Sequence, residues 1–235
     1  MTTILLTGAS RGIGAAALAA LQARGAQVIG QATRSAPGVL GADFTEPQAP
    51  QILWEQALEA AGGSIDVLVN NAGLFSPNPV EGSDIGWLDA WEDTLRINLT
   101  AAAQLSRFAI RHWQERGAEG RVVHVASRAG HRGDSPAHWH YAAAKGGMLA
   151  LHKTIARGYA AQGILSYAIA PGFTDTGMAE DYLASRGGPG LLADIPLGRV
   201  ATPDEIATMI VFCALDAPPS MTGATLDANG ASYVR

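Results

Sequence analysis

The chain has 235 residues, of which 48% are hydrophobic and 16% are charged, and its formal net charge is −5. Lysine and arginine form no basic cluster, so these values argue against a nucleic-acid-binding groove and are ordinary for a soluble enzyme with one large core. Because Cys213 is the only cysteine, no disulfide can form within the chain, and we expect a reducing, cytoplasmic location. We expect no signal peptide, since the first residues lack a charged region, and no membrane span, since no apolar stretch approaches about 18 residues.

Short apolar runs alternate with longer helical patterns along the whole chain. The runs predicted as strands are Thr3–Leu6, Gln27–Ala32, Val39–Phe44, Ile65–Asn70, Arg121–Val125, Leu165–Ile169 and Ala224–Asp227. The segments predicted as helices are Gly12–Arg24, Pro50–Ala61, Trp87–Arg116, His140–Ala161 and Pro203–Leu215. Such alternation predicts an α/β fold with a seven-stranded parallel sheet that helices cover on both faces. No linker or repeat divides the chain, so we predict one doubly wound domain over residues 1–235.

Helix punctuation and irregular segments complete this outline. Thr202 and Pro203 are typical of an N-cap followed by proline at the first helical position. Arg34–Gly41 is too short and too rich in proline and glycine to hold a full helix. Phe173–Asp194 contains several glycines and a proline, which predicts a mobile flap over a site.

A glycine-rich loop joins the first predicted strand to an alanine-rich helix. Its glycines are Gly8, Gly12 and Gly14, in the spacing G-x-x-x-G-x-G. Glycine permits a tight turn and removes side chains that would block a phosphate, while the helix start offers unpaired N–H groups. A simple strand–helix turn is the alternative, but a strand before and a helix after favour a dinucleotide site.

The nature of the dinucleotide is indicated by the charges near this loop. An acid about 20 residues beyond the glycines suits the adenosine ribose of NAD, whereas an arginine suits the extra phosphate of NADP. That distance leads to Arg34, and Gln27–Ala42 contains no acid, while Arg11 adds a second cation within the loop. NADP(H) is therefore favoured, while NAD(H) and an ordinary solvated role for Arg34 stay open.

Tyr141 and Lys145 lie four residues apart on one predicted helix. Free tyrosine titrates near 10, and lowering that pKa by about 2–3 units requires ~3–4 kcal/mol of stabilisation of the phenolate. Lys145 falls on the same helical face and is expected to supply much of this. The pair alone is common, but its helix follows a buried strand that ends at Ser127, where open parallel sheets bind ligands. Together with the glycine loop, this arrangement predicts dinucleotide-dependent hydride transfer.

The sequence resembles the short-chain dehydrogenase/reductase family along essentially its whole length. The motifs that carry the resemblance are Thr7–Gly14, Asn70–Gly73, Arg96–Leu99 with Asn98, Ser127 with Tyr141–Lys145, Pro171–Thr176, and Pro196–Arg199 followed by Thr202–Ala207. The resemblance implies a Rossmann-type fold and an NAD(P)(H)-dependent oxidoreductase that interconverts a ketone and a secondary alcohol. Similarity to 3-oxoacyl carrier-protein reductases makes a 3-oxoacyl thioester the leading specific substrate.

The resemblance also implies roles for four catalytic residues. Tyr141 is the general acid for reduction or the base for oxidation, and Lys145 lowers its pKa and holds the nicotinamide ribose. Ser127 donates to the substrate oxygen, which stabilises developing charge. Asn98 anchors a water that links Lys145 to solvent; the alternative is a polar side chain satisfied by local backbone.

Cofactor contacts follow from the same resemblance. The expected cofactor-binding residues are Gly8, Ser10, Arg11, Gly12, Ile13, Gly14, Arg34, Asp43, Phe44, Asn71, Ala72, Gly73, Tyr141, Lys145, Pro171, Gly172, Thr174 and Thr176. Asp43 and Phe44 match the adenine contact, with a turn role for Asp43 as the alternative. Two departures stand out: the loop before Tyr141 is one residue longer than is common, and the tail Asp227–Ala231 lacks paired glycines, which should affect packing more than chemistry.

Substrate contacts are less well defined by the sequence. His131, Arg132, His138, Trp139 and His140 crowd the loop before Tyr141 without a convincing metal-ligand spacing, so we expect no metal and place them at the substrate entrance or a subunit contact. The residues expected to form a partly apolar pocket are Trp139, Phe173, Met178, Tyr182 and Leu183.

Three other functions occur on a similar fold. A dehalogenase-like lyase typically carries arginine in place of Lys145, an NADP-sensing binding protein needs no catalytic set, and a nucleotide-sugar epimerase usually has a further domain. We expect a small-molecule substrate, no nucleic-acid or membrane partner, and a homodimer or homotetramer. Helices Trp87–Arg116 and His140–Ala161 are the expected subunit contact, although both could simply cover the sheet.

Overall fold

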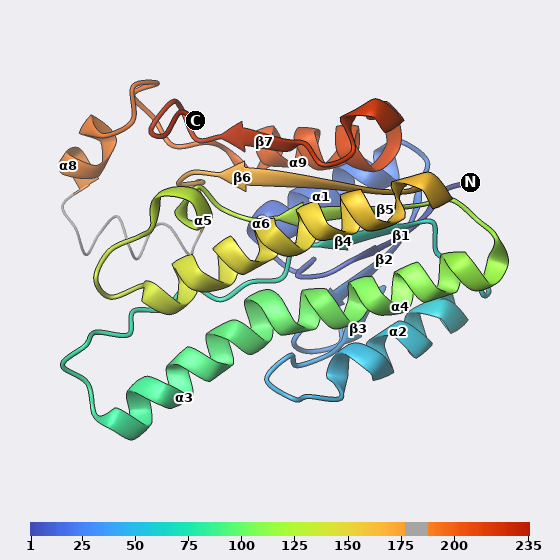
Figure 1. Ribbon diagram of the computed structural model, residues 1–235, viewed down its shortest axis with the longest axis horizontal. Helices are drawn as coiled ribbons and strands as arrows, with labels where there is room; N and C mark the ends of the chain where they lie inside the picture. The colour runs from blue at the N-terminus through green and yellow to red at the C-terminus, as the bar shows by residue number, and fades with distance from the viewer. Residues whose placement is uncertain (177–187) are drawn as a thin grey trace.

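The computed structural model describes residues 1–176 and 188–235, and a parallel sheet runs through its centre (Figure 1). Seven strands pair within these residues, in the order β3-β2-β1-β4-β5-β6-β7. The strands are β1 (Thr3–Leu6), β2 (Gln27–Ala32), β3 (Val39–Gly41), β4 (Val67–Asn70), β5 (Gly120–Val125), β6 (Ile164–Pro171) and β7 (Thr225–Ala228). All six pairings are parallel, which confirms the predicted doubly wound α/β fold.

Helices cover both faces of this sheet. The α-helices of the described residues are α1 (Gly12–Ala23), α2 (Ala49–Ala60), α3 (Asp84–Leu95), α4 (Ala101–Arg116), α5 (Ala129–Arg132), α6 (Trp139–Tyr159), α8 (Gly188–Ala193) and α9 (Pro203–Val211). In Figure 1, α2, α4 and α6 lie in front of the sheet, and α1 and α9 lie behind it.

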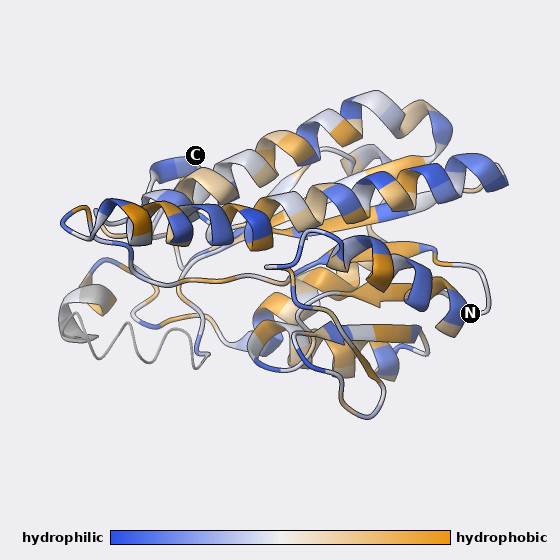
Figure 2. Cartoon of the chain, turned by 90° about the horizontal axis from the view of Figure 1, so that it is seen from below, coloured by the Kyte–Doolittle hydropathy of each residue, from blue (hydrophilic) through white to orange (hydrophobic). Residues whose placement is uncertain are grey.

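Each face of the sheet has its own apolar layer. Ile4 and Leu6 of β1 pack with α1 and α9, while Leu5 faces α2 and α4. Because strands covered on both faces need apolar residues at every position, β1 is a continuous apolar run. Figure 2 shows these strands in orange between helices that alternate orange and blue. The close approach of Trp113 depends on Gly120, where a Cβ would come within 2.0 Å of the indole ring.

The long predicted helix Trp87–Arg116 begins earlier and is divided. Ser83 caps α3, its hydroxyl accepting a hydrogen bond from the backbone of Gly86 at 3.3 Å. A π-helical turn, η1 (Arg96–Thr100), then connects α3 to α4. Wider turns of this kind are rare and often mark functional sites, and apolar periodicity does not reveal them.

The predicted end of β3 is wrong. The strand ends at Gly41 and not at Phe44, because Asp43 forms a turn in which its Oδ1 accepts from the Thr45 N–H at 3.0 Å. Between β2 and β3 the chain makes a tight turn in which Ala36 and Val39 exchange backbone hydrogen bonds of 3.1 and 2.9 Å. This agrees with the irregular structure expected for Arg34–Gly41.

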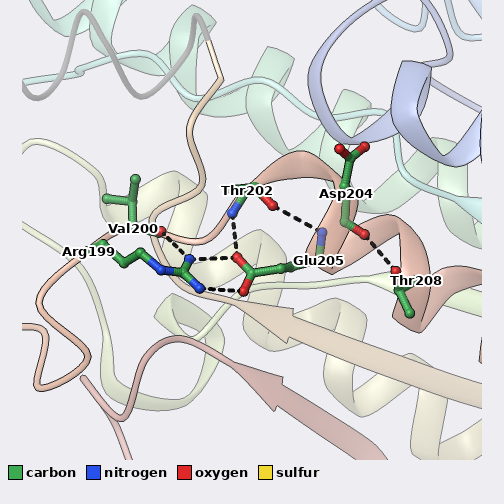
Figure 3. A network of polar contacts seen from close by, with 6 residues as sticks. All are labelled: Arg199, Val200, Thr202, Asp204, Glu205 and Thr208. Carbon is green, nitrogen blue, oxygen red and sulfur yellow. Dashed lines mark hydrogen bonds and ion pairs between the residues drawn. The ribbon is translucent and has the colours of Figure 1, made fainter.

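The start of α9 is capped as predicted. Thr202 accepts from the Glu205 N–H at 3.3 Å, and the Glu205 carboxylate accepts from the Thr202 N–H at 2.8 Å, with Pro203 next in the chain. Arg199 completes the network by donating to both Glu205 oxygens at 2.7 and 2.8 Å (Figure 3). The Arg199 guanidinium is the main reason that the pKa of Glu205 is lowered to about 2. Such reciprocal capping fixes where the helix begins.

The predicted flap Phe173–Asp194 is described only at its two ends. Residues 177–187, with Met178, Tyr182 and Leu183, lie outside the described residues. Thr174 forms an isolated parallel bridge with Ala201, which lies just before α9. Among the described residues, none of the helices combines the length and the apolar character that crossing a bilayer requires.

Candidate active site

One cleft of about 500 Å³ opens at the carboxyl edge of the sheet. The segments that follow β1, β4, β5 and β6 meet there, as is usual for ligand sites in open parallel sheets. The predicted site residues that line it are Gly8, Ser10, Arg11, Gly12, Ile13, Gly14, Asp43, Phe44, Asn71, Ala72, Gly73, Ser127, Tyr141, Lys145, Pro171, Gly172, Thr174 and Thr176. Arg34 and Asn98 are not among the described residues that line the cleft.

The glycine loop forms a cradle that side chains would fill. Gly8 and Gly12 have φ angles of +69° and +53°, in the left-handed region that favours glycine. A Cβ on Gly14 would lie 1.9 Å from the carbonyl oxygen of Gly8. Among the described residues, no side chain caps the first turn of α1 and no acid lies within it. The cradle therefore fits the pyrophosphate of a dinucleotide, which would receive the free N–H groups of the helix start.

Thr7 and Asn71 hold this cradle in place, a role that the sequence did not reveal. The Asn71 side chain donates to the carbonyls of Thr7 and Gly8 at 2.9 and 3.1 Å. The Thr7 hydroxyl accepts from the N–H groups of Asn71 and Ala72, each at 3.0 Å. Asn71 lines the cleft, so its expected contact with the cofactor stays a prediction, while its amide group fixes the loop.

Gln31 is a second residue that sequence reasoning missed. It is a buried polar residue at the end of apolar β2, and it lines the cleft. Its Oε1 accepts from the Gly8 N–H at 2.9 Å, and its Nε2 donates to the Ala42 carbonyl at 2.7 Å. It thus joins the glycine loop to the segment after β3. Its position in an otherwise apolar strand was the feature of the sequence that could have indicated this role.

The adenosine end of the cleft bears on the choice of dinucleotide. Arg11 lines the cleft, and so does Thr33, whereas the neighbouring Arg34 is exposed to solvent. Asp43 lines the cleft and also accepts from the Thr45 hydroxyl at 2.8 Å, which is the turn role weighed above. The contact of Arg34 with a cofactor stays a prediction.

The pKa of Tyr141 is raised, which is opposite to the direction expected from its spacing with Lys145. Burial raises the pKa of Tyr141 to about 12, although a hydrogen bond with Ser127 lowers it in part. The Lys145 ammonium lies 5.8 Å from the centroid of the tyrosine ring and donates to the Val125 carbonyl at 2.8 Å. Burial also lowers the pKa of Lys145 to about 8. The chain's own residues therefore keep the phenol neutral near pH 7.

Ser127 lies where its hydroxyl can serve both the phenol and a ligand. Its Oγ accepts from the Ala129 N–H at 3.1 Å, which leaves the hydroxyl proton for donation. Ser127 and Tyr141 are hydrogen-bonded, so the two oxygens face the same part of the cleft.

The side chain of Asn98 is held by backbone from another segment of the chain. Its Oδ1 accepts from the Leu74 N–H at 2.7 Å, and its Nδ2 donates to the Leu74 carbonyl at 2.8 Å. Its fully buried amide group is thus bonded to backbone 24 residues away in the chain, not to the local backbone of the alternative, and the water that would link Lys145 to solvent stays a prediction. A Cβ on Gly73 would lie 3.1 Å from Asn98 Oδ1 and 3.7 Å from Lys145 Nζ, so Asn98 fixes the wall beside the lysine.

Two residues of the histidine-rich loop, His138 and His140, are buried. His138 stacks on Phe75 with a centroid distance of 4.1 Å, and Phe75 meets the edge of Tyr141 at 4.7 Å. Of the five loop residues placed at the substrate entrance, Arg132 lines the cleft, and the other four are absent from its described lining. No group of three or more metal-ligating side chains occurs within the described residues.

The substrate end of the cleft includes residues that the sequence analysis did not name. These are Leu74, Phe75, Arg128, Asp134, Ser135 and Asp194. They come from loops after four different elements, so their proximity is a property of the fold and not of any one motif.

The chain is similar to known proteins along nearly its whole length. A family model described as enoyl-(acyl carrier protein) reductase matches residues 8–230. The chain is 36% identical to the 3-oxoacyl-[acyl-carrier-protein] reductases of Salmonella typhimurium and Escherichia coli, over 98% of this chain and 96% of theirs. It is also 36% identical to cis-4-hydroxycyclohexanecarboxylate dehydrogenase of Sinomonas cyclohexanicum, over 96% of this chain and 94% of that protein.

A solved structure is similar as well. It is a putative 2-deoxy-D-gluconate 3-dehydrogenase from Agrobacterium tumefaciens with bound NADP, with a TM-score of 0.84 and 31% identity over 97% of this chain and 95% of that one. The chain belongs to the short-chain dehydrogenase/reductase family, whose members are oxidoreductases that interconvert ketones and secondary alcohols.

Proposed function

We propose that Ser127, Tyr141 and Lys145 carry out the reduction of a ketone, or the reverse oxidation of a secondary alcohol, with NADP(H). The observation that carries this proposal is that all three side chains line the same cleft as the glycine cradle. When bound, the cofactor would supply or accept the hydride and, in its oxidised form, a positive charge beside the phenol.

The proton is handled by the chain itself. A pKa of about 12 keeps Tyr141 protonated at neutral pH, which suits a general acid that donates to the carbonyl oxygen during reduction. Ser127 donates to the same oxygen and stabilises the charge that develops there. Oxidation requires the phenolate, so its rate should rise with pH.

NADP(H) is supported by several features of the cofactor end. Arg11 lines the cleft, and no acid occurs in Gln27–Ala42. The similar structure from Agrobacterium tumefaciens holds NADP. Gly8, Gly12 and Gly14 would receive the pyrophosphate, and Lys145 the nicotinamide ribose.

The substrate class is open between two kinds of molecule. Some relatives are named for a 3-oxoacyl chain on a carrier protein, which was the sequence-based expectation. Others are named for hydroxy acids with a free carboxylate. A dehalogenase-like lyase is disfavoured because Lys145 and the glycine cradle are both present.

Replacing the phenol separates an enzyme from an NADP sensor. We expect Tyr141→Phe to reduce kcat by about 10²–10⁴-fold, because the proton donor is lost, while NADPH binding persists. Cofactor oxidation and NADPH fluorescence measure the two quantities. Tyr159→Phe, at the far end of α6, is the control and should retain turnover. If Tyr141→Phe turned over normally, the catalytic assignment would be wrong.

We also infer one domain over residues 1–235, a cytoplasmic location and a homodimer or homotetramer. The oligomer is supported by α3, which exposes Ile85 and Leu88 and carries acidic residues, while α4 carries arginines such as Arg107 and Arg116. Antiparallel pairing of two copies would set acidic against basic halves. Sedimentation equilibrium measures the assembly.

A further inference from the structure

Arg128 follows Ser127 directly and is almost fully buried, with 9% of its surface exposed. It lines the substrate end of the cleft together with Phe173. The backbone N–H of Arg128 donates to the Pro171 carbonyl at 3.0 Å. The guanidinium of Arg128 lies 4.9 Å from the centroid of the Phe173 ring. A permanent positive charge therefore lies in the wall beside the residue that contacts the reacting oxygen.

The C-terminal tail orients this arginine and a second one. Arg128 donates to the Ser232 hydroxyl, and Arg132, one turn later on α5, donates to the Ser232 carbonyl at 3.4 Å. The Ser232 hydroxyl in turn donates to the Asn229 carbonyl at 2.6 Å. The turn that places Ser232 requires Ala231 to adopt a φ of +64°, which an alanine seldom does. The tail thus fixes both guanidinium groups at the cleft.

Acidic residues also line this end of the cleft, but they are exposed to solvent whereas Arg128 is buried. Asp134, Asp194 and Arg132 are exposed, so water screens their charges. Arg128 is buried, where charge acts more strongly. Its planar fork of donors matches the oxygen pair of a carboxylate or phosphate.

We propose that Arg128 is a specificity-determining residue that binds an anionic group, a carboxylate or a phosphate, on the ketone or alcohol substrate, with Arg132 adding charge at the rim. This inference rests on the proposed function, in which Ser127 and Tyr141 act on the carbonyl oxygen. An acyl thioester carries no charge near its ketone, so the proposal favours a keto acid or a keto phosphate.

Matched pairs of substrates test this directly. The series contains keto acids with the carboxylate two to four carbons from the ketone, each against its methyl ester, and hydroxyacetone phosphate against hydroxyacetone. We expect the whole chain with NADPH to reduce at least one anion with a kcat/KM about 10- to 100-fold above that of its neutral partner. A higher kcat/KM for the keto acids indicates a carboxylate site, and a higher kcat/KM for hydroxyacetone phosphate indicates a phosphate site.

Variants assign the preference to one residue. Arg128→Gln should remove the preference, mainly by raising KM for the anion. Arg128→Lys should restore part of it, because it returns the charge without the fork. Arg24→Gln removes a cation on the far side of α1 and should behave like the unaltered chain.

A binding measurement keeps the two proposals separate. Titration calorimetry with pentanoate and methyl pentanoate, which have no ketone, should show binding of the anion that Arg128→Gln abolishes. If anions and esters bind and react alike, or if Arg128→Gln weakens both equally, the inference about Arg128 is wrong. If pentanoate binds through Arg128 but no ketone is reduced, the proposed function is wrong and the anion site stands.

Discussion

Gly14 shows how a single atom decides the cofactor cradle. Its α-carbon lies so close to Gly8 that a methyl group would overlap the Gly8 carbonyl, at 1.9 Å. The neighbouring obstacle is backbone and not a flexible side chain, so it cannot move aside without breaking the hydrogen bonds from Asn71. The cradle can therefore form only if the residue at position 14 has no side chain.

We expect Gly14→Ala to lower the free energy of unfolding by about 3 kcal/mol and to abolish NADPH binding, because the loop must open. Urea denaturation and NADPH fluorescence measure these effects. Gly158→Ala is the matched control. Gly158 is exposed on α6 with no atom within 4 Å of an added Cβ, so alanine there should stabilise the helix by up to about 1 kcal/mol. Equal behaviour of the two variants would contradict the steric argument.

Single residues also mark the limit of sequence reasoning. The glycines, Ser127, Tyr141 and Lys145 were identifiable because their spacing and order carry the chemistry. The partners of Asn71 and Asn98 were not, because each bonds to a segment more than twenty residues away. The pKa of Tyr141 could not be read from the i,i+4 spacing either, since the ammonium is directed to a backbone carbonyl instead.

At the scale of elements, α9 depends on the network at its first turn. The segment before it pairs with Phe173–Asp175, of which Phe173 and Thr174 line the cleft, through backbone hydrogen bonds of 3.0 and 2.8 Å at Ala201. Capping of α9 and the position of Thr174 are therefore coupled through one short stretch of chain.

Thr202→Ala should lower the free energy of unfolding by about 1 kcal/mol, because the N-cap oxygen is lost. Thr208→Ala is the control, since Thr208 lies inside the same helix and donates only to the Asp204 carbonyl, at 2.9 Å (Figure 3). That change should be nearly neutral, because alanine is the better helix former. Chemical denaturation measures the free energy of unfolding of both variants. An equal loss in the two would contradict a stabilising role for the Thr202 cap.

Element boundaries were predictable where composition punctuates them. β1 and β2 have the predicted bounds, since each apolar run is closed by polar residues or glycine. The end of β3 was predicted too late because the turn at Asp43 is set by a side-chain hydrogen bond. The π-helical turn at Arg96–Thr100 was missed because its apolar spacing resembles that of an ordinary helix.

At the scale of the whole molecule, the layer between the sheet and α4 and α6 is partly polar. His152 lies 2.8 Å from the Ser166 hydroxyl through Nδ1, and its ring centroid is 6.0 Å from that of His124. Both histidines are fully buried. Burial, more than any neighbouring charge, lowers the pKa of His124 to about 3 and that of His152 to about 4.

These histidines should make stability depend on pH. Their folded pKa values lie below the unfolded value of about 6.5, so the unfolded chain binds more protons and stability falls as the pH drops from about 6.5 towards 4. We expect a loss of about 2 kcal/mol per pH unit below pH 6, measured by urea denaturation. In the double variant His124→Asn, His152→Asn, the free energy of unfolding should depend less steeply on pH. In His112→Gln, this dependence should change less than in the double variant. An unchanged slope in the double variant would exclude this explanation.

The one cysteine of the chain gives a probe of motion at a known place. Cys213 is buried behind the sheet in the π-helical turn η3 (Phe212–Asp216) after α9, and burial raises the pKa of its thiol to about 11. A thiol-directed alkylating reagent can therefore react only during moments when this corner separates from β5. Since α9 packs on α1, whose first turn forms the cradle, the labelling rate reports how strongly an occupied cradle suppresses such openings elsewhere.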